Sequence, residues 1–237
     1  MWECTLLKTL VIVPAYNEEE SIEKVICSLR EECPAADFVV VNDGSSDGTA
    51  EICRRLGAPL LDLPVNLGLS GAFQTGMRYA WEQGYEAAIQ FDADGQHDVT
   101  KIQPMTERME TSGADIIIGS RFIDCRKPNS LRMLGSRLLS FVIRLTTGQK
   151  VTDPTSGMRL YGPKVLKQFA SCLNYGPEPD TVAFLIRQGA RVEEMQVEMH
   201  EREAGQSYLT AAKSAKYMMN MFVSILLVQF FRKGEQK

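Results

Sequence analysis

Short apolar runs alternate with segments of helical periodicity over the first 120 residues, and this alternation constrains the fold more than any other feature of the chain. Parallel strands need long crossover connections, most often helices, so the pattern is typical of a mostly parallel sheet covered by helices. Strands are expected at 9–13, 38–41, 58–63, 87–91 and 116–119. Helices are expected between them at 21–32, 49–56, 72–83 and 99–111.

The alternation becomes less regular after residue 120. Further helices are expected at 131–145, 163–173 and 180–188, followed by a late strand at 191–197. The 237 residues suffice for a large core, and 44% hydrophobic against 24% charged residues is ordinary for a globular protein. The sequence therefore predicts one α/β domain over residues 1–208 and a C-terminal amphipathic or apolar helix within 209–237.

Charge and cysteine content restrict the partners and the compartment. The net charge of −4 gives no overall basic field, so nucleic acid is not expected as a partner. The six cysteines contain no C-x-x-C pair, and the apolar run at 9–13 reads as a short strand rather than a secretory leader. Both observations predict a protein of the reducing cytoplasm.

Two of the expected strands end in polar turns. The first runs into VPAYNEE, starting at Val13, and the second into NDGSSDGT, starting at Asn42. Open α/β sheets bind ligands at the carboxyl ends of their strands. Asp43 is suited to accept hydrogen bonds from a nucleobase or ribose, whereas Asp47 is expected to cap the next helix. The alternative for both turns is an ordinary strand-to-helix connection.

The motif DADGQH follows the expected strand at 87–91 and places Asp92 and Asp94 one residue apart. Two carboxylates this close repel each other unless a cation binds them. Hard oxygen ligands suit Mg²⁺ or Mn²⁺, which would also hold the phosphates of a nucleotide-sugar. His97, in the same motif, is expected to be an ordinary hydrogen-bonding histidine.

Residues 120–150 are locally basic, with seven Lys or Arg residues against a single acidic residue, Asp124. Arginine binds phosphate oxygens through paired hydrogen bonds, and this stretch follows the expected diphosphate site. It would suit an anionic acceptor or an anionic membrane surface. The alternative is a solvated helix face.

The C-terminal segment contains fifteen uncharged residues, 217–231, with basic residues on both sides. This is shorter than the roughly 20 apolar residues that span a bilayer. An interfacial membrane helix and a helix buried on the domain or between the subunits of a homo-oligomer are equal alternatives.

Six motifs occur between Val13 and Ser207 in the order VPAYNEE, NDGSSDGT, DADGQH, GSR, DPTSGMRLY and HEREAGQS. In this order they resemble the polyprenyl-phosphate (dolichyl-phosphate) glycosyltransferase branch of family 2. The resemblance implies a GT-A fold, which is a Rossmann-like mixed, mostly parallel sheet flanked by helices. It also implies inverting transfer from a nucleotide-sugar, with UDP preferred, to a polyprenyl phosphate. The protein would then work at the inner face of the cell membrane, where some relatives act beside a small membrane protein.

The resemblance also implies roles for the residues at matching positions. The nucleotide-sugar would be bound by Pro14, Tyr16, Glu18, Val41, Asp43, Asp92, Ala93, Asp94 and Arg121. The metal, Mg²⁺ or Mn²⁺, would be held by Asp92, Asp94 and Gln96. The acceptor phosphate would be contacted by Arg132, Ser136 and Arg202. Catalysis would depend on Asp92, Asp94 and Arg121.

The sequence departs from the family pattern at two positions. Asn42 stands where the family often has a first aspartate, and Tyr208 follows Ser207 where a basic residue is common. Three other functions stay open. The first is a soluble family 2 enzyme that glycosylates a saccharide hydroxyl, with Asp153 or Glu178 as the base. The second is a non-catalytic scaffold that binds a nucleotide-sugar, and the third, more distant, is a nucleotide-sugar pyrophosphorylase.

Overall fold

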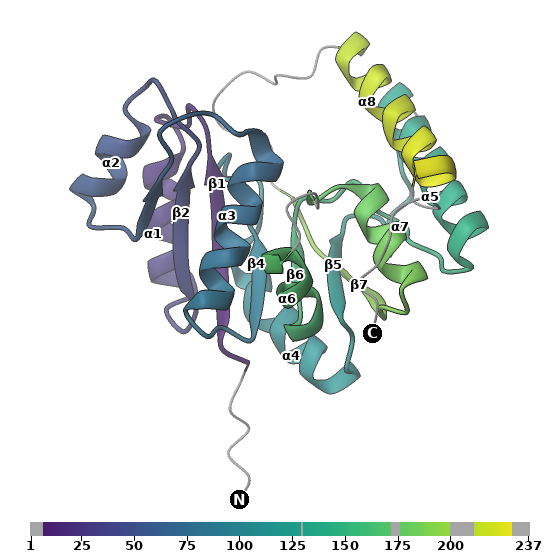
Figure 1. The fold of residues 1–237 in the computed structure, drawn as a ribbon, viewed down its shortest axis with the longest axis horizontal. Coiled ribbons are helices and arrows are strands. Elements are labelled where there is room, and N and C mark those ends of the chain that lie inside the picture. The colour runs from purple at the N-terminus through teal and green to yellow at the C-terminus, as the bar shows by residue number, and fades with distance from the viewer. Residues whose placement is uncertain (1–6, 129, 172–175, 200–210, 229–237) are drawn as a thin grey trace, which may run out of the picture.

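The computed structural model describes residues 7–128, 130–171, 176–199 and 211–228. The side chains of residues 131, 132, 211–215 and 228 also lie outside the description. Within these ranges the chain folds into one sheet with helices on both faces, as predicted (Figure 1).

The described strands form a seven-stranded sheet in the order β3-β2-β1-β4-β6-β5-β7. All neighbouring pairs are parallel except those made by β6, which is antiparallel to both β4 and β5. The strands are β1 Thr9–Ala15, β2 Asp37–Asn42, β3 Leu60–Asp62, β4 Ala87–Gln90, β5 Ile116–Ser120, β6 Arg159–Tyr161 and β7 Val192–Gln196.

Each crossover between the early strands is helical. The helices are α1 Ile22–Glu32, α2 Thr49–Arg55, α3 Gly68–Glu82, α4 Ile102–Ser112 with the preceding 3₁₀ turn η1 Val99–Lys101, α5 Leu131–Thr147, α6 Pro163–Ser171, α7 Pro179–Arg187, α8 Ala211–Val223 and the π-helical turn η2 Ser224–Val228. All the expected elements therefore form, with ends displaced by a few residues.

Both faces of the sheet are buried, which explains why its strands are continuously apolar. Along β1, Leu10 and Ile12 belong to the core under α3 and α6, whereas Val11 and Val13 belong to the core under α1 and α4. The second face thus needs apolar residues as much as the first.

Strand β6 is the element that the sequence did not predict. It lies inside the motif 153–161, which reads as a polar loop because Arg159 interrupts the apolar pattern. The side chain of Arg159 is nonetheless 98% buried, since only 2% is exposed, and it donates to the carbonyls of Pro154 and Pro177. These two bonds satisfy the two terminal nitrogens, whereas the buried Nε has no hydrogen-bond partner among the described residues, so the burial of this charge is only partly compensated.

The order of the strands brings the polar turns to one edge. β1 is paired with β2 on one side and with β4 on the other, so the chain reverses its direction of winding there. Such a switch point leaves a crevice at the carboxyl ends of the strands. The turns that follow β1, β2 and β4 therefore meet at this crevice.

The C-terminal helix packs on the domain. α8 lies beside α5, and Ile225 of η2 is fully buried in the core under α7 and α5 (Figure 1). None of the helices in the described ranges has the length and apolarity needed to cross a bilayer. The expected boundary between residues 208 and 209 falls at 200–210, outside the described residues.

Gly76 of α3 is expected to be required for the packing of this helix on β1. A Cβ atom at residue 76 would lie 2.3 Å from Cγ2 of Ile12. Gly76→Ala should therefore destabilise the protein by about 1–3 kcal/mol, although the same change in an open helix is stabilising. Urea unfolding would measure the difference.

Gly135→Ala is the matched control, because it makes the same change inside α5. There the new methyl group would meet only the flexible side chain of Met218, at 3.0 Å. A larger loss of stability in Gly135→Ala than in Gly76→Ala would contradict the packing argument.

Candidate active site

Asp92 and Asp94 lie directly beyond β4, at the crevice. Asp92 is held by Gln90, whose Nε2 donates to Oδ1 at 3.0 Å, and 35% of the Asp92 side chain is exposed. Asp94 is buried, and its Oδ1 accepts the backbone N–H of Gln96 at 3.1 Å. The turn that carries both carboxylates is thus fixed before any ligand binds.

His97 orients this turn, as expected for a hydrogen-bonding histidine. Its Nδ1 accepts the backbone N–H of Asp92 at 3.1 Å, so the neutral ring carries its proton on Nε2. That buried nitrogen lies 3.6 Å from Oδ2 of Asp92 and makes no hydrogen bond among the described residues. Its proton therefore points toward the Asp92 carboxylate.

The two carboxylates are suited to form part of a metal site. The described residues contain no group of three or more His, Cys, Asp or Glu side chains that would enclose a metal alone. Mg²⁺ and Mn²⁺ are commonly bound by one or two carboxylates together with substrate phosphates and water, and two aspartates fit that arrangement. Gln96 lies on the same turn, and its role as a third ligand stays a prediction.

The loop before β6 lies against Asp92. A Cβ atom on Gly157 would be 2.3 Å from Oδ2 of Asp92, so no side chain fits there. Between this loop and the strand end lies a cavity of roughly 360 Å³. It is lined by Leu69, Gln90, Asp92, Thr155, Ser156, Gly157, Arg159, Pro177, Glu178, Tyr217 and Met218. We call it the donor-side cavity.

The predicted nucleotide residues meet beside the carboxylates. The pairing of β1 with β2 sets Ala15 opposite Asn42, and the N–H of Asp43 donates to the carbonyl of Ala15 at 2.8 Å. Asp43 is buried and accepts the N–H of Leu67 through Oδ1 at 2.7 Å. Pro14 is the second-last residue of β1 and pairs with Val41, so the turns that follow β1 and β2 are adjacent.

Tyr16 and Glu18 follow on the same turn. Tyr16 is exposed, whereas Glu18 accepts the hydroxyl of Ser21 at 2.8 Å. Asp47 is expected from the sequence to cap α2, but the N-cap position is Gly48. Asp47 lies one residue earlier, where it accepts the N–H groups of Thr49, the first residue of α2, and of Glu19. The side chains of Val41 and Ala93 are buried in the two cores, so they offer a ligand only their backbone.

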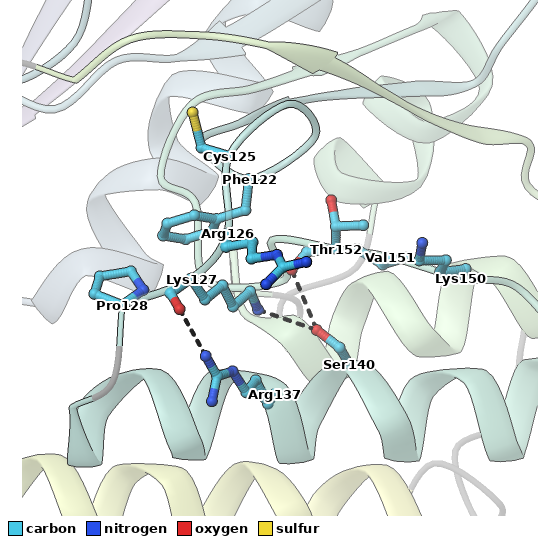
Figure 2. Close-up of a pocket in the computed structure, with 10 residues that line it drawn as sticks. All are labelled: Phe122, Cys125, Arg126, Lys127, Pro128, Arg137, Ser140, Lys150, Val151 and Thr152. Atoms are coloured by element: carbon cyan, nitrogen blue, oxygen red, sulfur yellow. Dashed lines mark hydrogen bonds between the residues drawn. The ribbon is translucent and has the colours of Figure 1, made fainter.

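A second cavity, of roughly 750 Å³, lies on the other side of the loop (Figure 2). We call it the basic cavity, because four of its lining side chains are cationic and none is acidic. The lining residues are Phe122, Cys125, Arg126, Lys127, Pro128, Arg137, Ser140, Lys150, Val151 and Thr152. An anion is the ligand that such a lining attracts.

Lys127 is the least hydrated of these cations. Its Nζ donates to the hydroxyls of Ser136 at 2.8 Å and Ser140 at 3.4 Å. Burial lowers the pKa of Lys127, and the positive charge of Arg121 lowers it further, against the opposite effect of Asp153. The structure thus places Ser136, a predicted phosphate contact, beside an ammonium group. The side chain of Arg132 and the whole of Arg202 lie outside the described residues.

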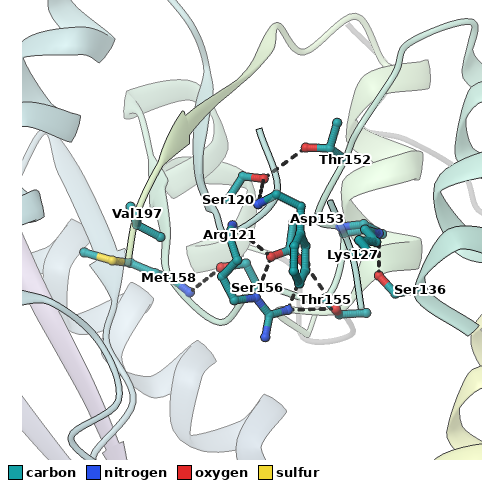
Figure 3. Close-up of polar contacts among 12 residues, drawn as sticks. Ser120, Arg121, Lys127, Ser136, Thr152, Asp153, Thr155, Ser156, Met158 and Val197 are labelled. Atoms are coloured by element: carbon teal, nitrogen blue, oxygen red, sulfur yellow. Dashed lines mark hydrogen bonds and ion pairs between the residues drawn. The ribbon is translucent and has the colours of Figure 1, made fainter. Parts of the chain in front are cut away.

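Arg121 follows β5 and binds Asp153 (Figure 3). Nε and one terminal nitrogen donate to the two carboxylate oxygens at 2.7 and 2.8 Å, and the same terminal nitrogen reaches Thr155 at 3.3 Å. Glu194 of β7 holds the other side of the loop by accepting the backbone N–H groups of Thr152 and Asp153. A phosphate that contacts Arg121 would have to share its guanidinium with Asp153.

Glu178, which precedes α7, and Tyr217 of α8 form part of the lining of the donor-side cavity. The Tyr217 hydroxyl donates to Oε2 of Glu178, and burial together with the Glu178 charge raises the pKa of Tyr217. Glu178 is therefore placed where a carboxylate base for a hydroxyl acceptor would be useful, whereas Asp153 is enclosed by Arg121 and fully buried.

Sequence reasoning missed four residues that line these cavities. Gln90 and Arg159 carry a visible signal, because each is a polar residue within an apolar strand segment. Lys127 is one basic residue among seven, and its desolvation depends on the packing of α5. Tyr217 reaches the cavity only because α8 folds back over α5, and no local pattern predicts that contact.

The sequence of the chain is similar to those of known glycosyltransferases. The family model described as Glycosyl transferase family 2 matches residues 10–169. An undecaprenyl-phosphate mannosyltransferase from Micrococcus luteus is 31% identical over 91% of this chain and 93% of its own. A UDP-N-acetylglucosamine–dolichyl-phosphate N-acetylglucosaminyltransferase from Methanococcus voltae is 30% identical over 66% of this chain and 70% of its own.

A solved structure shares the fold. Glucosyl-3-phosphoglycerate synthase from Mycobacterium tuberculosis, in complex with Mn²⁺, UDP-glucose and phosphoglyceric acid, superposes with a TM-score of 0.68. The match covers 97% of this chain and 82% of that chain at 17% sequence identity, so it supports the fold alone.

The Arg121–Asp153 pair predicts a pH-dependent stability. Burial alone would raise the pKa of Asp153, but the hydrogen bonds and charge of Arg121 outweigh it and lower the pKa. Asp153→Asn should cost about 3 kcal/mol of unfolding free energy at pH 7, because it leaves a cation poorly paired.

A carboxyl group whose pKa is lowered on folding stabilises the protein at pH values above its pKa in the unfolded chain, which is about 4. This stabilisation is lost as the pH falls through the pKa of the folded protein. The difference between the wild type and Asp153→Asn should therefore shrink below about pH 4. Urea unfolding at pH 7, 5 and 3 would measure it. A difference that is constant over this range would show that the pair does not act through the ionised carboxylate.

Proposed function

The chain belongs to glycosyl transferase family 2, and we propose that it transfers a sugar from a nucleotide-sugar to the phosphate of a polyprenyl phosphate. Its fold is of the GT-A type. The observation that carries the proposal is the position of Asp92 at one cavity, with Asp94 two residues later on the same turn, and of a cluster of cations at a second cavity. A diphosphate with its metal fits the first, and an acceptor phosphate fits the second.

The donor would lie along the crevice at the ends of β1, β2 and β4. Asp43 and the turn from Pro14 to Glu18 would bind the nucleoside, and Asp92 and Asp94 would hold Mg²⁺ or Mn²⁺. A bound divalent ion supplies positive charge that stabilises the departing diphosphate. We take UDP as the preferred nucleotide, supported by the relatives and neighbours whose names contain UDP-sugars.

The acceptor chemistry needs no strong base on the protein. A phosphate oxygen would bond to the anomeric carbon while the bond from that carbon to the diphosphate breaks, so the diphosphate leaves with the electron pair and the configuration inverts. A phosphate monoester is largely ionised at neutral pH, so the protein has to position it. Lys127 and Arg137, which line the basic cavity, would do this. Ser136 is fully buried and bonds Lys127, and it stays a predicted contact together with Arg132 and Arg202.

A polyprenyl phosphate resides in a membrane, so we place the protein at the cytoplasmic face of the cell membrane. The curated relatives named above support a lipid-phosphate acceptor. A second candidate acceptor, a saccharide hydroxyl, is favoured by one observation, which is that Glu178 lines the donor-side cavity together with Asp92. Glu178 would then be the general base.

The proposal predicts glycolipid formation. The purified protein, incubated with Mn²⁺, a panel of UDP- and GDP-sugars and undecaprenyl phosphate, should form a polyprenyl-phosphate sugar with at least one donor. Asp92→Asn and Asp94→Asn should each lower the rate by about 10²-fold or more, the scale for loss of a key electrostatic stabiliser. Thin-layer chromatography of labelled product measures both effects.

A saccharide product in a parallel acceptor panel, with no glycolipid from any donor, would favour the second candidate. Binding of a nucleotide-sugar with no turnover in either panel would indicate a non-catalytic scaffold.

The basic cavity predicts a separate effect on the acceptor. Lys127→Gln keeps a group that bonds the two serines but removes the charge, so KM for the lipid phosphate should rise about tenfold while KM for the donor stays constant. Arg144→Gln is the matched control, because it removes an exposed charge of α5 that lies outside the cavity. A rise in the donor KM alone would contradict the assignment.

A further inference from the structure

Helix α5 exposes an apolar stripe to solvent. Four of its side chains are between 47% and 67% exposed, namely Leu134, Leu138, Phe141 and Leu145. Their spacing of three or four residues places them on one narrow side of the helix. The opposite side is buried, with Leu139, Val142 and Ile143 in the core. The stripe is therefore additional to the apolar residues that the fold requires.

The C-terminal helix extends this stripe into a wider surface. Met219, Val223 and Leu227 recur every four residues along α8 and η2 and are between 41% and 61% exposed. The two helices lie side by side (Figure 1), and a Cβ atom on Gly135 would lie 3.0 Å from the Met218 side chain. Leu138 follows Gly135 on the same helix side and Met219 follows Met218, so both stripes border one contact. We call their sum the α5/α8 surface.

The sequence segments that contain these two helices carry charges of a single sign. Residues 125–152 and 204–234, which contain these helices, hold ten Lys and Arg residues and no Asp or Glu. Because the whole chain has a net charge of −4, the remaining residues carry −14. An apolar stripe with a basic border is the pattern that inserts among acyl chains and attracts anionic head groups.

We propose that the α5/α8 surface docks on an anionic phospholipid bilayer, with the exposed side chains of both helices entering the head-group region. A second copy of the chain is a poorer occupant, because a symmetric contact would bring two basic borders together. The inference rests on the proposed function in one respect. Docking by this surface would bring the basic cavity, which α5 also lines through Arg137 and Ser140, to the depth of a lipid phosphate.

The test is flotation of the full-length protein with vesicles of phosphatidylcholine alone or with 30% phosphatidylglycerol, at about 0.1 M salt. The wild type should float with the anionic vesicles. The double variant Phe141→Ser/Leu145→Ser should have a membrane partition constant that is lower by about tenfold or more, because two apolar side chains no longer enter the bilayer. Both residues are exposed, so circular dichroism and the melting temperature should not change.

The matched control is Trp81→Ser, which removes an apolar side chain of comparable exposure, 43%, from α3. It should float as the wild type does. Equal flotation of the double variant and the wild type, or no flotation of the folded wild type, would overturn the proposal. A third result would also overturn it. In that case light scattering shows that the wild type is a dimer, the double variant Phe141→Ser/Leu145→Ser is a monomer, and the wild type does not bind the vesicles.

A soluble acceptor separates this proposal from the proposed function. With a short-chain, water-soluble isoprenyl phosphate, the double variant should turn over as the wild type does, because it changes no residue of either cavity. Flotation without any transfer would support the surface and contradict the function. Transfer to the soluble acceptor without flotation would support the function and contradict the surface.

Discussion

The ion pair between Arg121 and Asp153 organises both candidate binding regions. It joins the end of β5 to the loop that precedes β6, and Glu194 of β7 holds the same loop from the other side. The loop then passes so close to Asp92 that only glycine fits at position 157. One wall of the donor-side cavity and one wall of the basic cavity thus depend on a single buried carboxylate, and a change at Asp153 is expected to disturb both.

The two cavities differ in the charges that line them. Asp92 and Glu178 line one, together with the buried Arg159, whereas four cations and no carboxylate line the other. A reaction between a metal-bound diphosphate sugar and a phosphate must bring two anionic reactants together, and their repulsion would be largest at the bond that forms. Under the proposed function, separate sites would bind the two reactants, and Arg121 and the bound ion would screen the repulsion between them.

The sequence predicts the fold and the donor side better than the acceptor side. The turns after β1, β2 and β4 contain their polar residues within a few positions of an apolar strand, so Asp43, Asp92 and Asp94 could be assigned from local pattern. Strand β6 could not, because three residues with a buried Arg159 form it only between two partners distant in sequence. The same holds for Lys127 and Tyr217. Their environments are made by α5 and α8, and the contact between those helices depends on tertiary packing alone.

Helix α8 faces the donor-side cavity on one side and the outside of the protein on the other. Tyr217 bonds Glu178 at the donor-side cavity, and Met219, two residues later, faces outward. A helix is too stiff to move one of these residues without the other. Whatever settles against its outer side must therefore also set the position of the cavity wall, and loss of that contact would loosen the wall. An enzyme built in this way would use its nucleotide-sugar chiefly where its acceptor is found, because a contact on the outer side of α8 would also hold the cavity wall on its inner side in place.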